Sequence, residues 1–449
     1  MSQIIFLSFP ETSSDMYSQD IRDKLEEKDI ELGDRITVSG REGRLMPKPE
    51  SGDSDVVVLK DESGYNLGLE PENLELLEKM DGIEESNGLE PSYSDDKPDI
   101  LFLHTGGTIS SRVSYEEGGV DPSAHEVEDM VEMYPELAEE VNIHSEVIAE
   151  MLSEDMEPEH WQQIAETIHE LKDEYDGIVV GHGTDTMSYT GAALSLMLKG
   201  IDTGVLLVGS QRSSDRPSSD ASMNLRCASK FLKETDFQGI GICMHQNSED
   251  LACNILPPQK VRKMHTSRRD AFEPVNTDLL GTVNIETGEI SKNYEDSHEG
   301  YSFEPGFSQD VGWLRVRPGM KPEELKFILE HDYQGLVVEG TGLGHMPVND
   351  FDDNTQHHAE ILDKLGEIAE DNLVVMTSQC LNGRVDMDVY SAGHKIQEAG
   401  VIGAGDMHPE LAYVKLMWSI SQAEDLEEAE QIFSKDYSGE LEERSVYSD

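Results

Sequence analysis

The pattern of apolar and polar positions changes near residue 98. Before that point, short runs rich in apolar and β-branched residues lie at 35–38, 55–59 and 65–69, separated by turn residues such as Gly and Pro. Short strands with frequent turns predict a small β-barrel or β-sandwich. We therefore expect a β-rich N-terminal domain over residues 1–79, of the small SH3-like barrel type. Residues 80–97 are polar and without apolar periodicity, which predicts a linker.

From residue 98, strand-like and helix-like patterns alternate. Continuous apolar runs at 100–103, 177–180 and 204–208 each end in a polar loop, and helical periodicity fills 126–140, 158–175 and 189–198. This alternation predicts an α/β fold with a parallel sheet and helices on both faces. Ligands of such sheets bind beyond the carboxyl ends of the strands, so the polar loops are the candidate site.

A second α/β unit begins near Gly312, with strand-like runs at 335–342 and 372–379. We assign the first α/β domain to residues 98–300 and the second to 310–449. Residues 276–301 contain several glycines and are expected to join the two domains. The acidic end, 423–449, carries one amphipathic pattern that predicts a terminal helix.

The chain is strongly acidic. Its 449 residues include 34 Lys+Arg and 93 Asp+Glu, which gives a formal net charge of −59. Self-repulsion at such a charge destabilises a compact state in dilute salt. At about 1 M salt the Debye length falls to about 3 Å, so most of that repulsion is screened. The composition therefore predicts a protein of a halophile, adapted to a very salty cytoplasm.

Several functional classes are disfavoured by composition. No run of 18 apolar residues exists, and the first residues lack the basic region of a signal peptide, so we expect a cytoplasmic protein without membrane contact. No basic stripe points to direct nucleic-acid binding. The cysteines show no paired spacing that would suggest a metal site or a disulfide framework, and they are Cys227, Cys243, Cys253 and Cys380.

Two loops at predicted strand ends carry hydroxyl groups. Thr105 follows the first buried strand and precedes two glycines, while Thr184 and Asp185 follow the second. A threonine hydroxyl is a weak nucleophile that needs a base. His182 could supply it, although a histidine between glycines is more often structural. Each loop alone is equally compatible with a Gly-rich turn that contains a capping residue.

Five cations lie within ten residues of one another: Lys260, Arg262, Lys263, Arg268 and Arg269. By contrast, the 59 residues between Arg112 and Lys172 contain no Lys or Arg. One interpretation is a surface patch that pairs with acidic neighbours. The other is an active-site lysine whose pKa is lowered by burial or by a second cation, so that it acts as a base.

The two loop motifs together resemble a known family. Residues 105–109, Thr-Gly-Gly-Thr-Ile, and 182–187, His-Gly-Thr-Asp-Thr-Met, are similar to the paired motifs of the bacterial-type L-asparaginase/glutaminase family. The N-terminal module resembles one branch of that family, the archaeal glutamyl-tRNA(Gln) amidotransferase D subunits. Further segments that resemble the family or this branch are 153–156, 209–220, 338–342, 377–385 and 403–418.

The resemblance implies roles for individual residues. Thr105 matches the family's first threonine and is the expected nucleophile, with Thr184, Asp185 and Lys263 as the proton-handling set. Lys260 is the alternative if the alignment slips by three residues. The resemblance also suggests that Tyr115 activates the first threonine, and that Ser153 and Glu154 hold the substrate amino acid.

The resemblance further implies a glutaminase that hydrolyses glutamine through an acyl-enzyme, with asparagine as an alternative substrate. The ammonia would pass to a partner, the E subunit of the amidotransferase, in a heterotetramer of two D and two E chains. No cofactor is expected in this chain; ATP and Mg²⁺ are expected at the partner, which would also make most contacts with Glu-tRNA(Gln). Two alternatives remain: a stand-alone L-asparaginase, and a non-catalytic scaffold that kept the fold.

Overall fold

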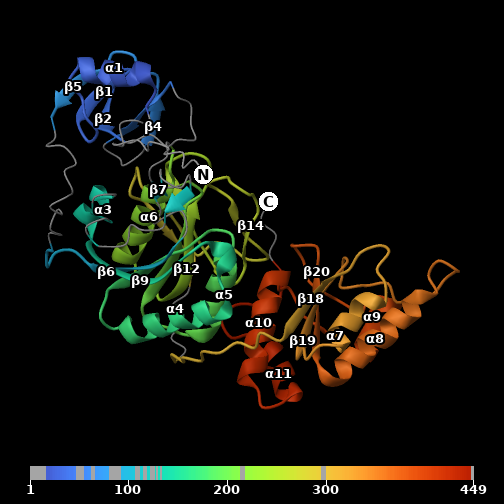
Figure 1. The fold of residues 1–449 in the computed structure, drawn as a ribbon. Coiled ribbons are helices and arrows are strands. Elements are labelled where there is room, and N and C mark those ends of the chain that lie inside the picture. Colours follow the sequence, from blue (N-terminus) through green and yellow to red (C-terminus); the bar gives the residue numbers. More distant parts are fainter. Residues whose placement is uncertain are drawn as a thin grey trace, which may run out of the picture.

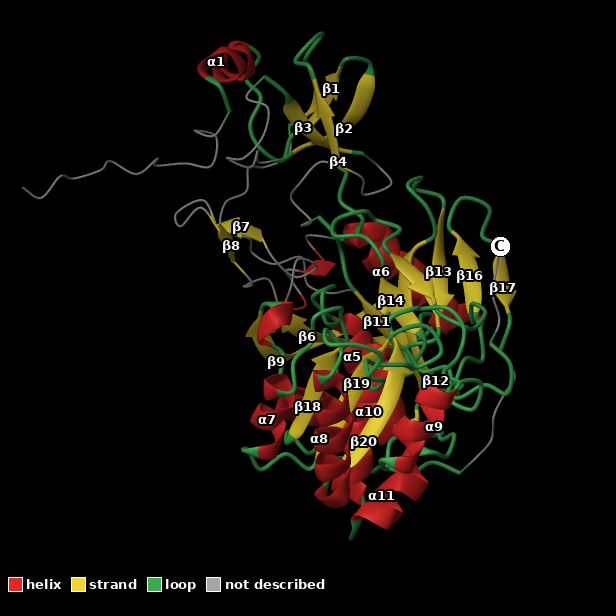
Figure 2. Ribbon diagram, turned by 90° about the vertical axis from the view of Figure 1, so that its right-hand side faces the viewer, coloured by secondary structure: helices red, strands yellow, loops and turns green. Residues whose placement is uncertain are grey.

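The computed structural model describes residues 17–46, 55–61, 66–79, 93–106, 112–114, 119–121, 127, 130–131, 134–212, 218–294 and 300–445. Three sheets of substantial size follow one another along the chain. The N-terminal sheet lies at one end of the molecule, apart from the two α/β domains (Figures 1 and 2). No helix in the described ranges has the length and apolar character that crossing a membrane requires.

The N-terminal domain is a small antiparallel β domain, as predicted. Its five strands have the order β4-β3-β2-β1-β5 and pack against one helix. The helix was not predicted, although Ile21 and Leu25, four residues apart, are its buried face. The elements are α1 (Gln19–Glu27), β1 (Arg35–Val38), β2 (Arg41–Leu45), β3 (Val57–Lys60), β4 (Asn66–Leu69) and β5 (Glu75–Glu78).

The second domain is built on an eight-stranded sheet. Five neighbouring strands, β9-β6-β10-β11-β12, are parallel, and three antiparallel strands extend the sheet beyond β12. The strands are β6 (Asp99–Gly106), β9 (Asn142–Met151), β10 (Gly177–Gly181), β11 (Gly204–Val208), β12 (Gly239–His245), β13 (Ala252–Leu256), β16 (Gly281–Asn284) and β17 (Ile290–Lys292). Two further ribbons are β7 (Arg112–Ser114) with β8 (Gly119–Asp121), and β14 (Val261–Lys263) with β15 (Phe272–Pro274).

Helices cover both faces of this sheet, as the alternating pattern predicted. Because side chains of a strand alternate, successive strand residues belong to different cores: Leu101 packs on one face and Phe102 on the other. The first face is covered by α4 (Pro158–Leu171) and α5 (Met187–Met197), and the second by α3 (Pro135–Glu140) and α6 (Ala221–Glu234).

The third domain has a four-stranded parallel sheet with the order β18-β19-β20-β21. One face forms its own core, and the other shares the core of the second domain through α10, which packs against α5. The strands are β18 (Val311–Arg315), β19 (Gly335–Gly340), β20 (Leu373–Ser378) and β21 (Ile402–Gly403). The helices are α7 (Glu323–Leu329), α8 (His357–Asp371), α9 (Ser391–Glu398), α10 (Pro409–Gln422) and α11 (Leu426–Phe433).

The expected joint between the α/β domains begins too early in the chain. Residues 276–301 were predicted to be a connection, but they contain β16 and β17, which belong to the eight-stranded sheet. One of the glycines that suggested a joint serves a strand: Gly281 begins β16, where a Cβ would lie 2.4 Å from the carbonyl oxygen of Ser291. The connection to β18 follows β17, and its described residues are 293–294 and 300–310.

Candidate active site

Thr105 lies at the carboxyl end of β6, next to β10. It is 1% exposed, and its hydroxyl donates a hydrogen bond of 2.9 Å to the carbonyl oxygen of Gly181 at the end of β10. The next residue, Gly106, has φ +97°, and a Cβ there would lie 2.3 Å from the carbonyl oxygen of Met151. Only glycine fits this turn, which fixes where the threonine leaves the sheet.

The loop after β10 brings a hydroxyl, an amine and a carboxylate together. The Nζ of Lys263 donates to Thr184 Oγ1 at 2.8 Å and to Asp185 Oδ1 at 2.8 Å. The lysine is 79 residues from Thr184 in sequence, so only the fold unites them. Thr184 is buried, whereas the Asp185 side chain is 65% exposed. Lys263 thus lies between a buried hydroxyl and an open carboxylate.

The structure separates the two candidate lysines. Lys260 is 1% exposed and forms an ion pair of 2.7 Å with Asp406, which is fully buried. Lys263, three residues later, is the lysine that reaches Thr184. The remaining cations of the cluster pair with carboxylates: Arg262 with Glu410, Arg268 with Asp270, and Arg269 with Asp250. All five cations of the cluster therefore pair with carboxylates, and Lys263 also contacts a threonine hydroxyl.

His182 has a structural environment. It is fully buried, its Nδ1 donates to the carbonyl oxygen of Gly183 at 2.7 Å, and its Nε2 accepts from the hydroxyl of Thr190 at 2.8 Å. Burial lowers its pKa to about 4, which keeps the imidazole neutral. With both ring nitrogens bound inside the core, His182 is not placed to act as the base.

The expected substrate residues follow β9 in a short 3₁₀ turn, Ser153–Asp155. Ser153 is buried against the glycine of the second motif, since a Cβ on Gly183 would lie 2.5 Å from the Ser153 Cβ. The Ser153 carbonyl oxygen also accepts from the hydroxyl of Thr186 at 2.6 Å. Glu154 is exposed beside it. Tyr115 lies outside the described residues.

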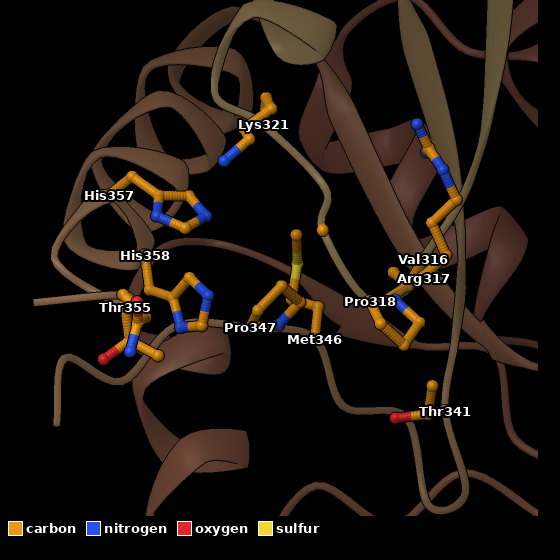
Figure 3. Close-up of a pocket in the computed structure, with 12 residues that line it drawn as sticks. Val316, Arg317, Pro318, Lys321, Thr341, Met346, Pro347, Thr355, His357 and His358 are labelled. Carbon is orange, nitrogen blue, oxygen red and sulfur yellow. The ribbon is translucent and has the colours of Figure 1, made fainter. Parts of the chain in front are cut away.

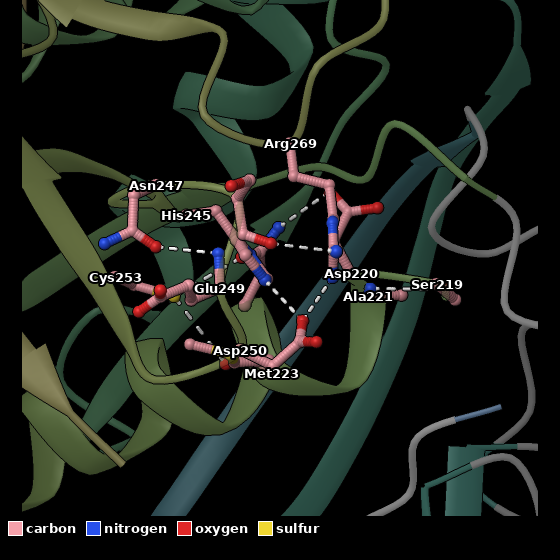
Figure 4. A network of polar contacts seen from close by, with 12 residues as sticks. Ser219, Asp220, Ala221, Met223, His245, Asn247, Glu249, Asp250, Cys253 and Arg269 are labelled. Carbon is pink, nitrogen blue, oxygen red and sulfur yellow. Dashed lines mark hydrogen bonds and ion pairs between the residues drawn. The ribbon is translucent and has the colours of Figure 1, made fainter. Parts of the chain in front are cut away.

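A polar network supports the loops around the site (Figure 4). Buried Asp220 accepts hydrogen bonds from the backbone N–H groups of Gln211 and Arg212, in the loop after β11. The pKa of Asp220 is raised, because the effect of burial outweighs the opposite effect of these hydrogen bonds. Asn224 joins Asp220 to His245 through bonds of 3.3 and 2.6 Å. His245 in turn contacts Asp250, which pairs with Arg269 in the segment after Lys263. The network thereby connects the loop after β11 to the segment after Lys263.

Two cavities lie near the carboxyl edges of the sheets. One, of about 410 Å³, is lined by Asp185, Tyr189, Trp161 and Tyr413 among others. Because Asp185 pairs with Lys263, this cavity lies beside that ion pair. The other, of about 490 Å³, belongs to the third domain and is lined by the cations and histidines shown in Figure 3: Arg317, Lys321, His357 and His358. Within the described ranges, no group of three or more His, Cys, Asp or Glu is arranged to hold a metal ion.

Sequence reasoning assigned no role to the third-domain residues that meet the lysine segment. Asp406 pairs with Lys260 at 2.7 Å, and Glu410 pairs with Arg262 at 2.8 Å. Both carboxylates belong to the segment 403–418, which was noted only for its family resemblance. The sequence shows that both residues carry a negative charge. It does not show that they are buried, or which of the 34 cations faces each carboxylate.

Comparisons with known proteins agree with this architecture. Residues 99–297 match the family described as "Asparaginase, N-terminal", residues 310–433 the "Glutaminase/Asparaginase C-terminal domain", and residues 30–78 the "GatD N-terminal domain". The chain is 39% identical over 443 residues to the glutamyl-tRNA(Gln) amidotransferase D subunit of Methanopyrus kandleri, with 93% of each chain covered. It is 40% identical over 444 residues to the corresponding protein of Pyrococcus furiosus, covering 94% of this chain and 97% of that one.

Solved structures of L-asparaginases also resemble this chain. The thermostable L-asparaginase from Thermococcus kodakarensis superposes with a TM-score of 0.67 at 32% identity, covering 77% of this chain and 99% of its own. L-asparaginase I from Vibrio cholerae O1 gives a TM-score of 0.67 at 28% identity, with the same coverage. These asparaginases are thus matched almost completely, yet they leave about a quarter of this chain unmatched.

Proposed function

The chain belongs to the family of glutamyl-tRNA(Gln) amidotransferase D subunits, and we propose that it is the glutaminase subunit of that enzyme. It is an amidohydrolase that releases ammonia from glutamine for the conversion of Glu-tRNA(Gln) to Gln-tRNA(Gln). One observation carries this conclusion: relatives of that name match 93% or more of the chain, while the L-asparaginase structures match 77%. The match of residues 30–78 to the "GatD N-terminal domain" supports the same assignment.

The proposed reaction begins at Thr105. Its hydroxyl oxygen bonds to the side-chain carbonyl carbon of glutamine, and its proton passes to the set formed by Thr184, Asp185 and Lys263. The carbon–nitrogen bond then breaks, the nitrogen takes up a proton, and ammonia leaves. Water attacks the acyl-enzyme, releases glutamate and restores the threonine. The contacts of 2.8 Å on both sides of Lys263 support its role as the proton carrier.

The substrate contacts are proposed around the same loop. Ser153 and Glu154 follow β9, and Ser153 adjoins the motif at Gly183, which supports a role for both in holding the amino-acid end of glutamine. Asp185 is exposed and near a cavity of about 410 Å³, which suits contact with the substrate ammonium group. Tyr115 is proposed to activate Thr105.

We propose that the ammonia is used by a partner, the E subunit of the amidotransferase, in an assembly of two D and two E chains. The partner would bind ATP and Mg²⁺, activate the glutamate on the tRNA and make most of the RNA contacts. The net charge of −59 supports this division, because a chain so acidic repels the phosphate backbone. Such an assembly works in the cytoplasm.

The decisive experiment is a glutaminase assay of the purified chain, alone and with its partner subunit and Glu-tRNA(Gln), in molar KCl. We expect ammonia release from glutamine to rise when both are added. Rapid hydrolysis of asparagine by the chain alone, without stimulation, would instead support the stand-alone L-asparaginase. Absence of hydrolysis in the complete complex would support the non-catalytic scaffold.

The acidic composition supports a second proposal, that the protein is adapted to high salt. Screening at about 1 M salt shortens the Debye length to about 3 Å, so the folded state should gain stability as salt is added. Urea unfolding midpoints measured at low and at molar KCl test this. A midpoint that stays constant or falls with KCl would show that the charge is not a salt adaptation.

A further inference from the structure

The strand that carries Lys263 has little support of its own. β14 has three residues and, among the described strands, pairs with β15 alone, in a two-stranded ribbon separate from the large sheet. Isolated two-stranded ribbons are marginally stable in water. Val261 and Phe272 anchor the ribbon in the core, but apolar burial is non-directional. The long lysine side chain therefore needs another element to fix its direction.

The third domain supplies directional contacts along β14. Lys260, just before the strand, pairs with Asp406 at 2.7 Å, and both side chains are at most 1% exposed. Arg262, the middle residue, pairs with Glu410 at 2.8 Å. Because successive strand residues point to opposite sides, holding Arg262 toward Glu410 turns Lys263 toward Thr184. The backbone is held as well, since His408 Nε2 donates to the carbonyl oxygen of Gln259 at 3.1 Å.

The far end of the ribbon is fixed to the same region. Asn276, two residues after β15, is 2% exposed and has φ +59°. Its Nδ2 lies 2.9 Å from the carbonyl oxygen of Asp406 and near those of Leu381 and Gly383, while its Oδ1 accepts from the Gly383 N–H at 2.8 Å. Both ends of the ribbon are thus bound to the third domain.

The carboxylate segment is itself immobilised. Asp406 Oδ1 accepts from the N–H of Glu442 at 3.2 Å, and the carbonyl oxygen of Met407 accepts from the buried hydroxyl of Thr377 at 2.8 Å. The segment continues into α10, which packs against α5, the helix that begins directly after the Thr184 loop. One third-domain unit therefore contacts both the lysine ribbon and the helix behind the threonine.

We propose that Asp406 and Glu410 are positioning residues for the reaction, which act by holding Lys263 at Thr184. We name the set Lys260, Arg262, Asn276, Asp406 and Glu410 the interdomain clamp. Through it, the third domain takes part in glutamine hydrolysis by acting on Lys263. This inference rests on the proposed function, because it assumes that Lys263 carries the proton.

The test compares two buried carboxylates of the third domain in the full amidotransferase complex. Asp406→Asn removes the clamp charge and keeps its shape. Glu440→Gln is the matched control, since Glu440 pairs with Lys415 at 2.6 Å with both side chains fully buried. In the described structure, neither Glu440 nor Lys415 has a hydrogen bond or ion pair with residues 260–276.

We expect Asp406→Asn to lower kcat for glutamine about 100-fold with KM changed less than about threefold, because small displacements of a reacting group cost rates of that size. Its pH–rate profile should shift, since Lys263 loses its fixed partners, and Asp406→Glu should recover part of kcat. Glu440→Gln should destabilise the protein but lower kcat and shift the pH profile much less than Asp406→Asn, because its loop reaches the clamp through backbone atoms, those of Glu442 at Asp406 and of Ser438 at Gln259. Equal kinetics for Asp406→Asn and Glu440→Gln would overturn the clamp.

Two further variants keep the outcome interpretable. If Asp406→Asn does not fold, Glu410→Gln replaces it, because its partner Arg262 is 33% exposed and its loss is milder; an unchanged kcat and pH profile there would also overturn the proposal. Lys263→Met tests the underlying function. Full activity of Lys263→Met would refute the proposed chemistry, whereas loss of activity there with an unaffected clamp variant would refute the clamp alone.

Discussion

Two parallel strands in different domains lead into the same dipeptide, Thr-Gly. Thr105 and Gly106 end β6 in the second domain, and Thr341 and Gly342 follow β19 in the third. Both threonine hydroxyls donate to a backbone carbonyl, of Gly181 at 2.9 Å and of His345 at 3.1 Å. Both glycines have positive φ, +97° and +53°. Locally the two turns are alike.

Their surroundings are different. Thr105 is buried beside the loop in which Lys263 meets Thr184, whereas Thr341 is exposed at a cavity of about 490 Å³ in the third domain. A Cβ on Gly106 would meet the backbone of Met151, but a Cβ on Gly342 would meet nothing within 4 Å. The difference teaches that similar strand-end turns can have unlike neighbours: beside Thr105 a second segment places Lys263 at Thr184, and the proposed chemistry depends on that neighbour.

The largest effect that would sharpen this comparison is expected from Thr105→Val. Removing the proposed nucleophile should lower kcat for glutamine by about 10⁴-fold, as for members of other catalytic sets. The same change at the other turn, Thr341→Val, should leave kcat within about threefold. Steady-state ammonia release by the complex measures both. Similar losses in the two variants would break the comparison.

Gly106→Ala is expected to have the next largest effect. The added Cβ would lie 2.3 Å from a backbone oxygen and would be strained at φ +97°, so the end of β6 must move. A displacement of this kind should lower kcat about 100-fold. Gly342→Ala is the control, since its open surroundings leave only the backbone strain of about 1 kcal/mol. Unfolding midpoints and kcat for both variants decide the matter.

His182, which directly follows β10, should make the stability of the second domain sensitive to acid. Its folded pKa of about 4 lies below its ordinary value of 6.5, so the unfolded chain gains a proton first as the pH falls. Stability should therefore decline from about pH 6.5 toward pH 4, by about 2 kcal/mol between pH 7 and pH 5. His182→Gln cannot protonate, and its unfolding midpoint should depend less on pH. Parallel pH curves would show that another group controls acid sensitivity.

The smallest effect is expected at the third-domain cavity. Lys321 lines that cavity, at the edge of the third-domain sheet and not at the edge of the eight-stranded sheet that carries Thr105. Lys321→Ala should therefore change kcat and KM for glutamine by less than about twofold. The charge change is at an exposed position, where substitutions usually alter stability by less than about 0.5 kcal/mol. A large kinetic effect would mean that the second turn also takes part in the chemistry.

The sequence by itself determined the parts that depend on local pattern. Alternation of apolar runs and helical periodicity predicted the α/β domains, since burial on both faces requires continuous apolar strands such as β10 and β11. The strand-end loops placed Thr105 and Thr184 at one sheet edge, because neighbouring parallel strands end together. Local pattern was insufficient where elements are short or polar: β16 and β17 were taken as a joint, and α1 was not anticipated.

The family resemblance favoured Lys263 over Lys260, but only the tertiary structure showed which lysine meets the threonine. Lys260 and Lys263 are of one type and three residues apart, and nothing local distinguishes them. The choice depends on partners distant in sequence: Asp406 is 146 residues from Lys260, and Thr184 is 79 residues from Lys263. Pairing a buried charge is a requirement of the folded interior, where an unpaired one is costly, so it is settled when the domains pack and not along the chain.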